Sequence, residues 1–215
     1  MFGTLVHQTI EDIHRAILDG EKVTVVKIAD DFERNYRGLI SSGYRPLGKG
    51  PKENALKQVI TYFKNNKDLM KRVVETEVEV NYEKENYIIN GKVDLLLGRD
   101  KKLELLDFKS QQKPNGQDPV IEKYRHQLHV YAHIIKERYE KEPERLYIYW
   151  TAEEHRKDAL QEINYNPALV ELAGRHFDQV AHCILQKDFT IKTPPDKTRV
   201  CKECDFRYFC NVYEA

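Results

Sequence analysis

The chain has 215 residues, and 35 Lys and Arg balance 35 Asp and Glu, so its formal net charge is zero. This length fits about one domain, while 40% hydrophobic residues with only 10 Gly and 8 Pro exclude a disordered or low-complexity chain. The N-terminus lacks a signal-peptide pattern and no apolar run approaches the ~18 residues that cross a bilayer, so we expect a cytoplasmic protein without a membrane segment. Without a strongly basic balance, any contact with nucleic acid needs a local site.

Apolar residues spaced three and four apart predict that residues 1–72 are helical. The predicted helices are one that ends near Asp19-Gly20, one over Val25 to Ser41, and one that opens at Pro51.

From Val73 onward, charged and apolar residues alternate, which is typical of strands. The predicted elements are strands over Val73 to Val80, Tyr87 to Leu97 and Leu103 to Lys109, a helix over Pro119 to Glu140, a strand over Leu146 to Thr151, and a helix over Pro167 to Gln186. This order predicts an α/β fold in which a mixed central sheet is flanked by helices. We expect one domain over 1–215, made of a helical portion (1–72), a sheet core (73–190) and a cysteine-containing tail (191–215).

Two aspartates and a lysine stand where a buried strand should be apolar. Asp107 and Lys109 share one face of their strand, and Asp94 interrupts an apolar run on the preceding strand. Paired carboxylates in an apolar setting are costly without a cation, and Mg²⁺ binds through one or two carboxylates. Such an ion can activate water against a phosphoryl group, and a nearby lysine can stabilise the developing charge. The pattern indicates metal-dependent phosphodiester hydrolysis, with an ordinary salt bridge as the alternative.

Two helices carry further polar candidates. Gln127 and Tyr131 lie four residues apart on one helix face with Tyr124, and they suit contacts to phosphate or sugar. Packing of the two tyrosines on the sheet is the simpler alternative. His7 stands on the opening helix with Glu11 one turn later, although a lone helical histidine is more often a surface or core residue than a ligand.

The cysteines gather near the C-terminus as Cys201-x2-Cys204-x5-Cys210, with Cys183 separate on the preceding helix. Without a secretory signal, clustered thiols favour metal binding over disulfides. The spacing could serve zinc or an iron–sulfur cluster, each of which wants four ligands. Three unpaired cysteines are the alternative.

Four motifs in order resemble the RecB-like nucleases of the PD-(D/E)XK superfamily: Phe2-Gly3-Thr4-Leu5-Val6-His7, Gly91-Lys92-Val93-Asp94, Leu106-Asp107-Phe108-Lys109-Ser110 and Gln127-Leu128-His129-Val130-Tyr131. The resemblance implies a restriction-endonuclease-like fold and a DNA nuclease that depends on Mg²⁺ or Mn²⁺, with exonuclease favoured over endonuclease. It implies a metal site made by His7, Asp94, Asp107 and the backbone carbonyl of Phe108, and a catalytic set of Asp94, Asp107, Lys109, Gln127 and Tyr131. Glu77 is a weaker candidate for an auxiliary contact, and a solvated strand face is the favoured interpretation of it.

AddB-type and CRISPR-associated members of that family have a similar cysteine triplet, which binds a [4Fe–4S] cluster with a fourth cysteine upstream of the histidine motif. Here that motif begins at residue 2, so we expect an incomplete cluster site in an excised fragment, in preference to a degenerate cluster or replacement by Cys183. The stretch from His7 to His14 looks like the nuclease module of UvrD/Rep-type helicases. The resemblance therefore implies a helicase partner, DNA end processing in repair or recombination, and association with the nucleoid.

Two other classes of function stay open. A catalytically silent DNA-binding or scaffold module of a helicase complex is the main alternative, and the intact Asp94, Asp107 and Lys109 favour the enzyme. An iron–sulfur or zinc redox protein is weaker, because it leaves these three residues unexplained.

Overall fold

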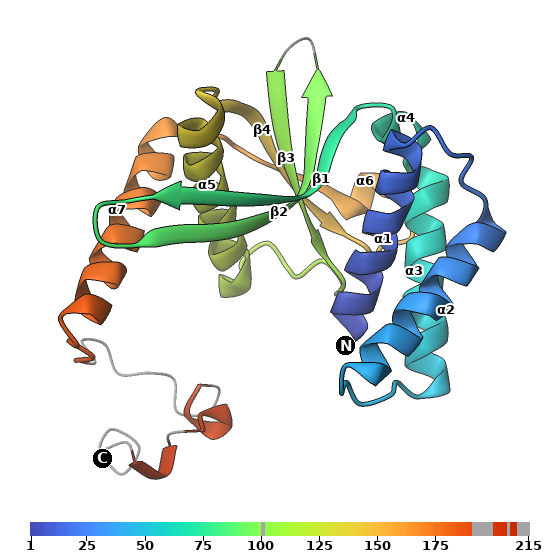
Figure 1. The fold of residues 1–215 in the computed structure, drawn as a ribbon, viewed down its shortest axis with the longest axis horizontal. Coiled ribbons are helices and arrows are strands. Elements are labelled where there is room, and N and C mark those ends of the chain that lie inside the picture. Colours follow the sequence, from blue (N-terminus) through green and yellow to red (C-terminus); the bar gives the residue numbers. More distant parts are fainter. Residues whose placement is uncertain (100–101, 191–199, 206, 210–215) are drawn as a thin grey trace. The chain divides into compact units, whose positions relative to one another are not determined.

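A computed structural model describes residues 1–99, 102–190, 200–205 and 207–209. The chain forms two compact units, Met1–His176 and Phe177–Ala215, and Figure 1 shows its helices and strands. The first unit contains the whole sheet and the helices packed on it. The expectation of a single domain stays a prediction.

The N-terminal portion is helical, as predicted. Its helices are α1 (Phe2–Leu18), α2 (Val25–Ser41), α3 (Lys49–Asn65) and the short α4 (Lys67–Met70). The Thr24 side chain caps α2 by accepting a hydrogen bond from the backbone N–H of Lys27, which explains the start of that helix. Helix α3 starts two residues before the predicted Pro51, which therefore lies within its first turn.

The five strands form one mixed sheet in the order β1-β2-β3-β4-β5. Their bounds are β1 Val73–Glu83, β2 Ile88–Arg99, β3 Lys102–Lys109, β4 Pro143–Trp150 and β5 Leu160–Ile163. Strands β3 and β4 are parallel and the other neighbouring pairs are antiparallel. This confirms the predicted α/β fold with a mixed sheet. Helix α6 (Arg156–Ala159) and strand β5 were not predicted, because four residues each are too few to show a period.

Helices lie on both sides of the strands that carry the polar motifs. Helix α5 (Pro119–Tyr139) connects the parallel strands β3 and β4 and packs against β1 to β4, whereas α1 packs against β1. Figure 1 shows α5 and α1 on opposite sides of β1, β2 and β3. Side chains from both helices can therefore approach the end of β3.

A cluster of aromatic side chains packs around Phe108 at the end of β3. The ring of Phe108 packs edge-on against Tyr62 at 5.1 Å and Tyr149 at 5.9 Å between centroids, and it stacks on His14 at 6.4 Å. All four side chains are buried. The backbone between Asp107 and Lys109 is thereby fixed by packing on the side away from those two charged groups.

Helix α7 (Pro167–Leu185) runs from the first unit into the second, which also holds two short 3₁₀ helices, Cys201–Glu203 and Arg207–Phe209. Among the helices of the described residues, none is both long and apolar enough to span a bilayer.

Candidate metal centre

The two aspartates predicted to meet lie at the point where β2 and β3 part. The last pair of the β2–β3 ladder toward this end is Leu95 with Leu106, so the next residues are Asp94 and Asp107. The Asp94 carboxylate bridges the gap, since its Oδ2 accepts a hydrogen bond of 2.7 Å from the backbone N–H of Phe108. This bond orients Asp94 and leaves its Oδ1 for another partner.

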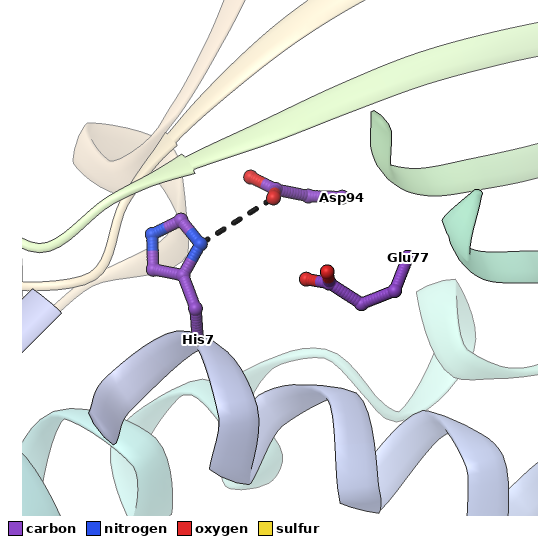
Figure 2. Close-up of side chains that lie close together, drawn as sticks. All are labelled: His7, Glu77 and Asp94. Carbon is purple, nitrogen blue, oxygen red and sulfur yellow. Dashed lines mark ion pairs between the residues drawn. The ribbon is translucent and has the colours of Figure 1, made fainter. Parts of the chain in front are cut away.

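That partner is His7 of α1, whose Nδ1 lies 3.4 Å from Asp94 Oδ1. Glu77 of β1 completes a group of three, because one potential ligand atom from each of His7, Glu77 and Asp94 lies within 4.8 Å of the others. Figure 2 shows the imidazole and both carboxylates converging on one space. Glu11, one turn beyond His7, instead forms an ion pair with Arg15.

Glu77 reaches this group through an unusual backbone conformation. Its φ of 51° is left-handed, which costs a non-glycine residue of the order of 1 kcal/mol. Its neighbours Thr76 and Val78 pair with Leu95 and Val93, so Glu77 faces Asp94 across the two strands. Its side chain is only 9% exposed. The interpretation of Glu77 as part of a solvated strand face is therefore wrong, because strand alternation gives no sign of a left-handed residue.

Lys109 and Asp107 form a second cluster beside the first. Lys109 Nζ lies 2.6 Å from Asp107 Oδ2, and both side chains are largely buried. The same ammonium donates a hydrogen bond of 2.9 Å to Gln127 Oε1, and Gln127 Nε2 donates one of 2.9 Å to the hydroxyl of Tyr131. The ring of Tyr124 lies 4.4 Å from Nζ. Helix α5 thus holds the lysine through side chains spaced three and four residues apart.

The charges of the two clusters act on one another. Burial and the charge of Asp94 raise the pKa of Asp107 to about 6, against the opposing effect of Lys109. Burial lowers the pKa of His7, but the hydrogen bond and charge of Asp94, with the charges of Asp107 and Glu77, outweigh it and leave that pKa above its ordinary value. Burial raises the pKa of Tyr131 to about 12, with the charge of Asp107 as the next cause. Asp94 and Asp107 therefore lie close enough for the negative charge of one carboxylate to affect the other.

Six of the predicted site residues are thus brought into these two clusters by side-chain contacts: His7 and Asp94 in the first, and Asp107, Lys109, Gln127 and Tyr131 in the second. The structure gives the Phe108 backbone N–H a hydrogen bond to Asp94, and its carbonyl stays a predicted ligand. In the tail, Cys201 is buried and Cys204 half-buried, while Cys210 lies outside the described residues.

Comparison with known proteins identifies the family of this chain. The model of the PD-(D/E)XK nuclease superfamily matches residues 1–211. The chain belongs to this superfamily. Its mixed sheet with flanking helices is consistent with the restriction-endonuclease-like fold that the sequence predicted.

Solved structures give more distant similarities. A protein from Eubacterium rectale described as a candidate exonuclease has 14% sequence identity and a TM-score of 0.59, and the match covers 97% of this chain and 74% of that one. This likeness concerns the fold alone. The protein SSO0001 has 14% identity and a TM-score of 0.44 over 98% of this chain and 84% of its own, which is too distant for an argument. A search of curated proteins gave no match.

Proposed function

We propose that this chain is a metal-dependent deoxyribonuclease whose metal ligands are His7, Glu77 and Asp94, with Asp107 beside them. The observation that carries the proposal is the convergence of three ligand atoms within 4.8 Å, next to an Asp107–Lys109 ion pair. Superfamily membership supports the same reaction class.

The donor set fits a hard divalent ion such as Mg²⁺ or Mn²⁺. The carboxylate oxygens of Glu77, Asp94 and Asp107 suit both ions. The buried Oδ2 of Asp107 has an ion pair but no well-aligned hydrogen-bond donor among the described residues. A cation shared by these carboxylates would offset the cost of burying them. When bound, such an ion polarises a phosphoryl oxygen and lowers the pKa of a coordinated water.

Lys109 is a side chain that brings a positive charge to this site, beside that of a bound metal ion. An ammonium has three hydrogens, and the hydrogen bond to Gln127 takes one of them. The ion pair with Asp107 and the ring of Tyr124 hold Nζ in place. The lysine can therefore orient an attacking water or donate to a phosphate oxygen on which negative charge develops.

Gln127 and Tyr131 act in this proposal as positioning residues. The Gln127 amide oxygen accepts the hydrogen bond from Lys109, and one amide N–H donates to the Tyr131 hydroxyl. These two hydrogen bonds favour a positioning role over the direct contact with phosphate or sugar that the sequence suggested.

Cleavage of labelled DNA tests the proposal. The purified chain should cut DNA in Mn²⁺ and lose this activity on chelation. Asp107→Asn should lose it as well, whereas Asp68→Asn, which changes an exposed acid paired with Arg156, should keep it. Mn²⁺-dependent DNA binding without cleavage would instead favour the silent scaffold module.

The proposal includes finer features that rest on sequence resemblance. We propose exonuclease rather than endonuclease action, in DNA end processing with a helicase partner. Linear and circular single strands distinguish the two modes, because an exonuclease leaves the circle intact. A metal bound by Cys201, Cys204 and Cys210 is a separate proposal.

A further inference from the structure

Lys92 stands between the candidate metal centre and the open part of the β1–β2 hairpin. The ladder pairs Lys92 of β2 with Glu79 of β1, so Glu77 is its diagonal neighbour. Lys92 Nζ forms an ion pair with the Glu77 carboxylate. Its side chain is 53% exposed, while that of Glu77 is 9% exposed. A flexible, solvated lysine therefore neutralises a carboxylate that also belongs to the ligand group.

Lys92 carries a positive charge in its ion pair with Glu77. Its hydrogen bond with Glu77 raises its pKa, and although burial opposes this, the charges of Glu77, Glu11 and Glu79 raise it further. A divalent ion bound by Glu77 would compete with this ammonium for the same carboxylate, and the two positive charges would repel each other at short distance. Lys92 would then have to leave Glu77.

The β1–β2 hairpin has room for the Lys92 side chain to turn away from Glu77. A hollow of about 410 Å³ is lined by Glu79, Asn81, Asn90, Gly91 and Lys92. Asn81 and Asn90 are direct partners in the ladder, two residue pairs further from the metal centre than Glu79 and Lys92. Amide side chains contact phosphate and sugar oxygens without regard to base sequence, and a lysine binds phosphate as a point charge.

We propose that Lys92 is a contact to a DNA phosphate that Glu77 holds back until a divalent ion takes the Glu77 carboxylate. Lys92 then turns to a phosphate of the strand that lies along Asn81 and Asn90 toward the metal centre. This inference rests on the proposed nuclease function and adds a residue and a coupling to it.

Lys92 should affect the binding of metal and the binding of DNA in opposite directions. Lys92 opposes metal binding when DNA is absent and favours DNA binding when metal is present. Since coupling between two ligands is reciprocal, DNA should also raise the affinity for metal, and Lys92 should contribute to that increase.

The test compares Lys92→Gln with Lys102→Gln, which removes an exposed lysine paired with Glu144. Calorimetry measures Ca²⁺ affinity without DNA, and fluorescence anisotropy measures the affinity for a labelled single strand at fixed Ca²⁺ over a series of salt concentrations, with a gel to verify an intact strand. Lys92→Gln should bind Ca²⁺ several-fold more tightly than the unmodified protein. It should bind DNA in Ca²⁺ more weakly, with a slope of log affinity against log salt reduced by about 0.7, the value of one phosphate contact on a single strand.

Lys102→Gln should match the unmodified protein in both measurements, and Lys92→Arg should restore DNA binding in Ca²⁺ because it keeps the charge. Weaker Ca²⁺ binding by Lys92→Gln, or DNA affinity and salt slope equal to those of Lys102→Gln, would overturn the proposal. Failure of the unmodified protein to bind Ca²⁺ at all would instead count against the proposed nuclease function.

Discussion

Gln127 accepts a hydrogen bond of 2.9 Å from the ammonium of Lys109, and this bond connects helix α5 to the end of strand β3. A hydrogen bond to a charged group contributes roughly 1.5–3 kcal/mol. The position of the lysine therefore depends on a side chain that does not itself belong to the acidic cluster.

Replacing Gln127 should slow the reaction without weakening substrate binding. We expect Gln127→Ala to lower kcat about tenfold to a hundredfold with little change in KM, because Lys109 keeps its charge but loses an orienting partner. Steady-state cleavage in Mn²⁺ measures this. Gln127→Glu keeps an acceptor and should recover most of the loss, whereas Gln161→Ala, which removes the acceptor of Trp150, is the matched control. An unchanged kcat in Gln127→Ala would show that the bond plays no part in turnover.

The left-handed backbone at Glu77 should make glycine unusually well tolerated there. Glycine adopts positive φ without strain, but in an ordinary strand it costs roughly 0.5–1 kcal/mol. Glu77→Gly should therefore cost less stability than Glu79→Gly on the same strand, while losing metal affinity. Urea unfolding of both variants measures the difference in the free energy of unfolding. A larger loss in Glu77→Gly would mean that the Glu77 side chain stabilises the fold more than its backbone strains it.

His14 should make the fold sensitive to mild acid. Burial lowers its pKa from 6.5 to about 3, and its Nε2 lies 2.8 Å from the hydroxyl of Tyr62. Below pH 6.5 the unfolded chain binds a proton that the folded chain refuses, so stability is lost as pH falls from 6.5 toward 3. The loss from this residue is about 2 kcal/mol by pH 5.

Urea unfolding at two pH values measures this effect. His14→Gln should show a smaller drop in stability between pH 6.5 and 5 than the unmodified protein, and His155→Gln, which changes an exposed histidine, should show the same drop as the unmodified protein. Equal pH dependence in His14→Gln would place the acid sensitivity elsewhere.

The cysteines should bind iron or zinc independently of the candidate nuclease centre. We expect protein purified without oxygen to contain one of these metals, with a brown colour if it is iron, and Cys204→Ser to lose it. Cys183→Ser should retain it, since Cys183 stands apart in sequence from the triplet Cys201, Cys204 and Cys210. Elemental analysis measures both, and a protein that holds neither iron nor zinc would contradict the prediction.

Local periodicity accounts for what the sequence predicted well. Asp107 and Lys109 share a face because strands have a period of two, and Gln127 and Tyr131 meet because a helix turn brings residues four apart together. Both relationships can be read from a few neighbouring residues. The bounds of α2 were predicted for the same reason, and the structure adds the cap at Thr24.

Features that depend on backbone detail or on distant contacts were not predicted. The left-handed φ of Glu77 leaves no mark on the alternating pattern of β1, so a contact at the site was only the less favoured interpretation of this residue. The ion pair of Lys92 with Glu77 depends on the register of β1 against β2, which no local motif fixes. The resemblance supplied candidate metal ligands, and the structure places Glu77 beside two of them, His7 and Asp94.

The proposed catalytic role of Lys109 is tested most directly by the single-turnover rate of DNA cleavage by Lys109→Ala at saturating Mn²⁺. Lys109 contacts both Asp107 and Gln127, so its loss should remove charge stabilisation at the reacting phosphate. Our expectation is a rate lower by about 10²–10³-fold, with Mn²⁺ binding retained in calorimetry. A rate within a few-fold of the unmodified protein would contradict it.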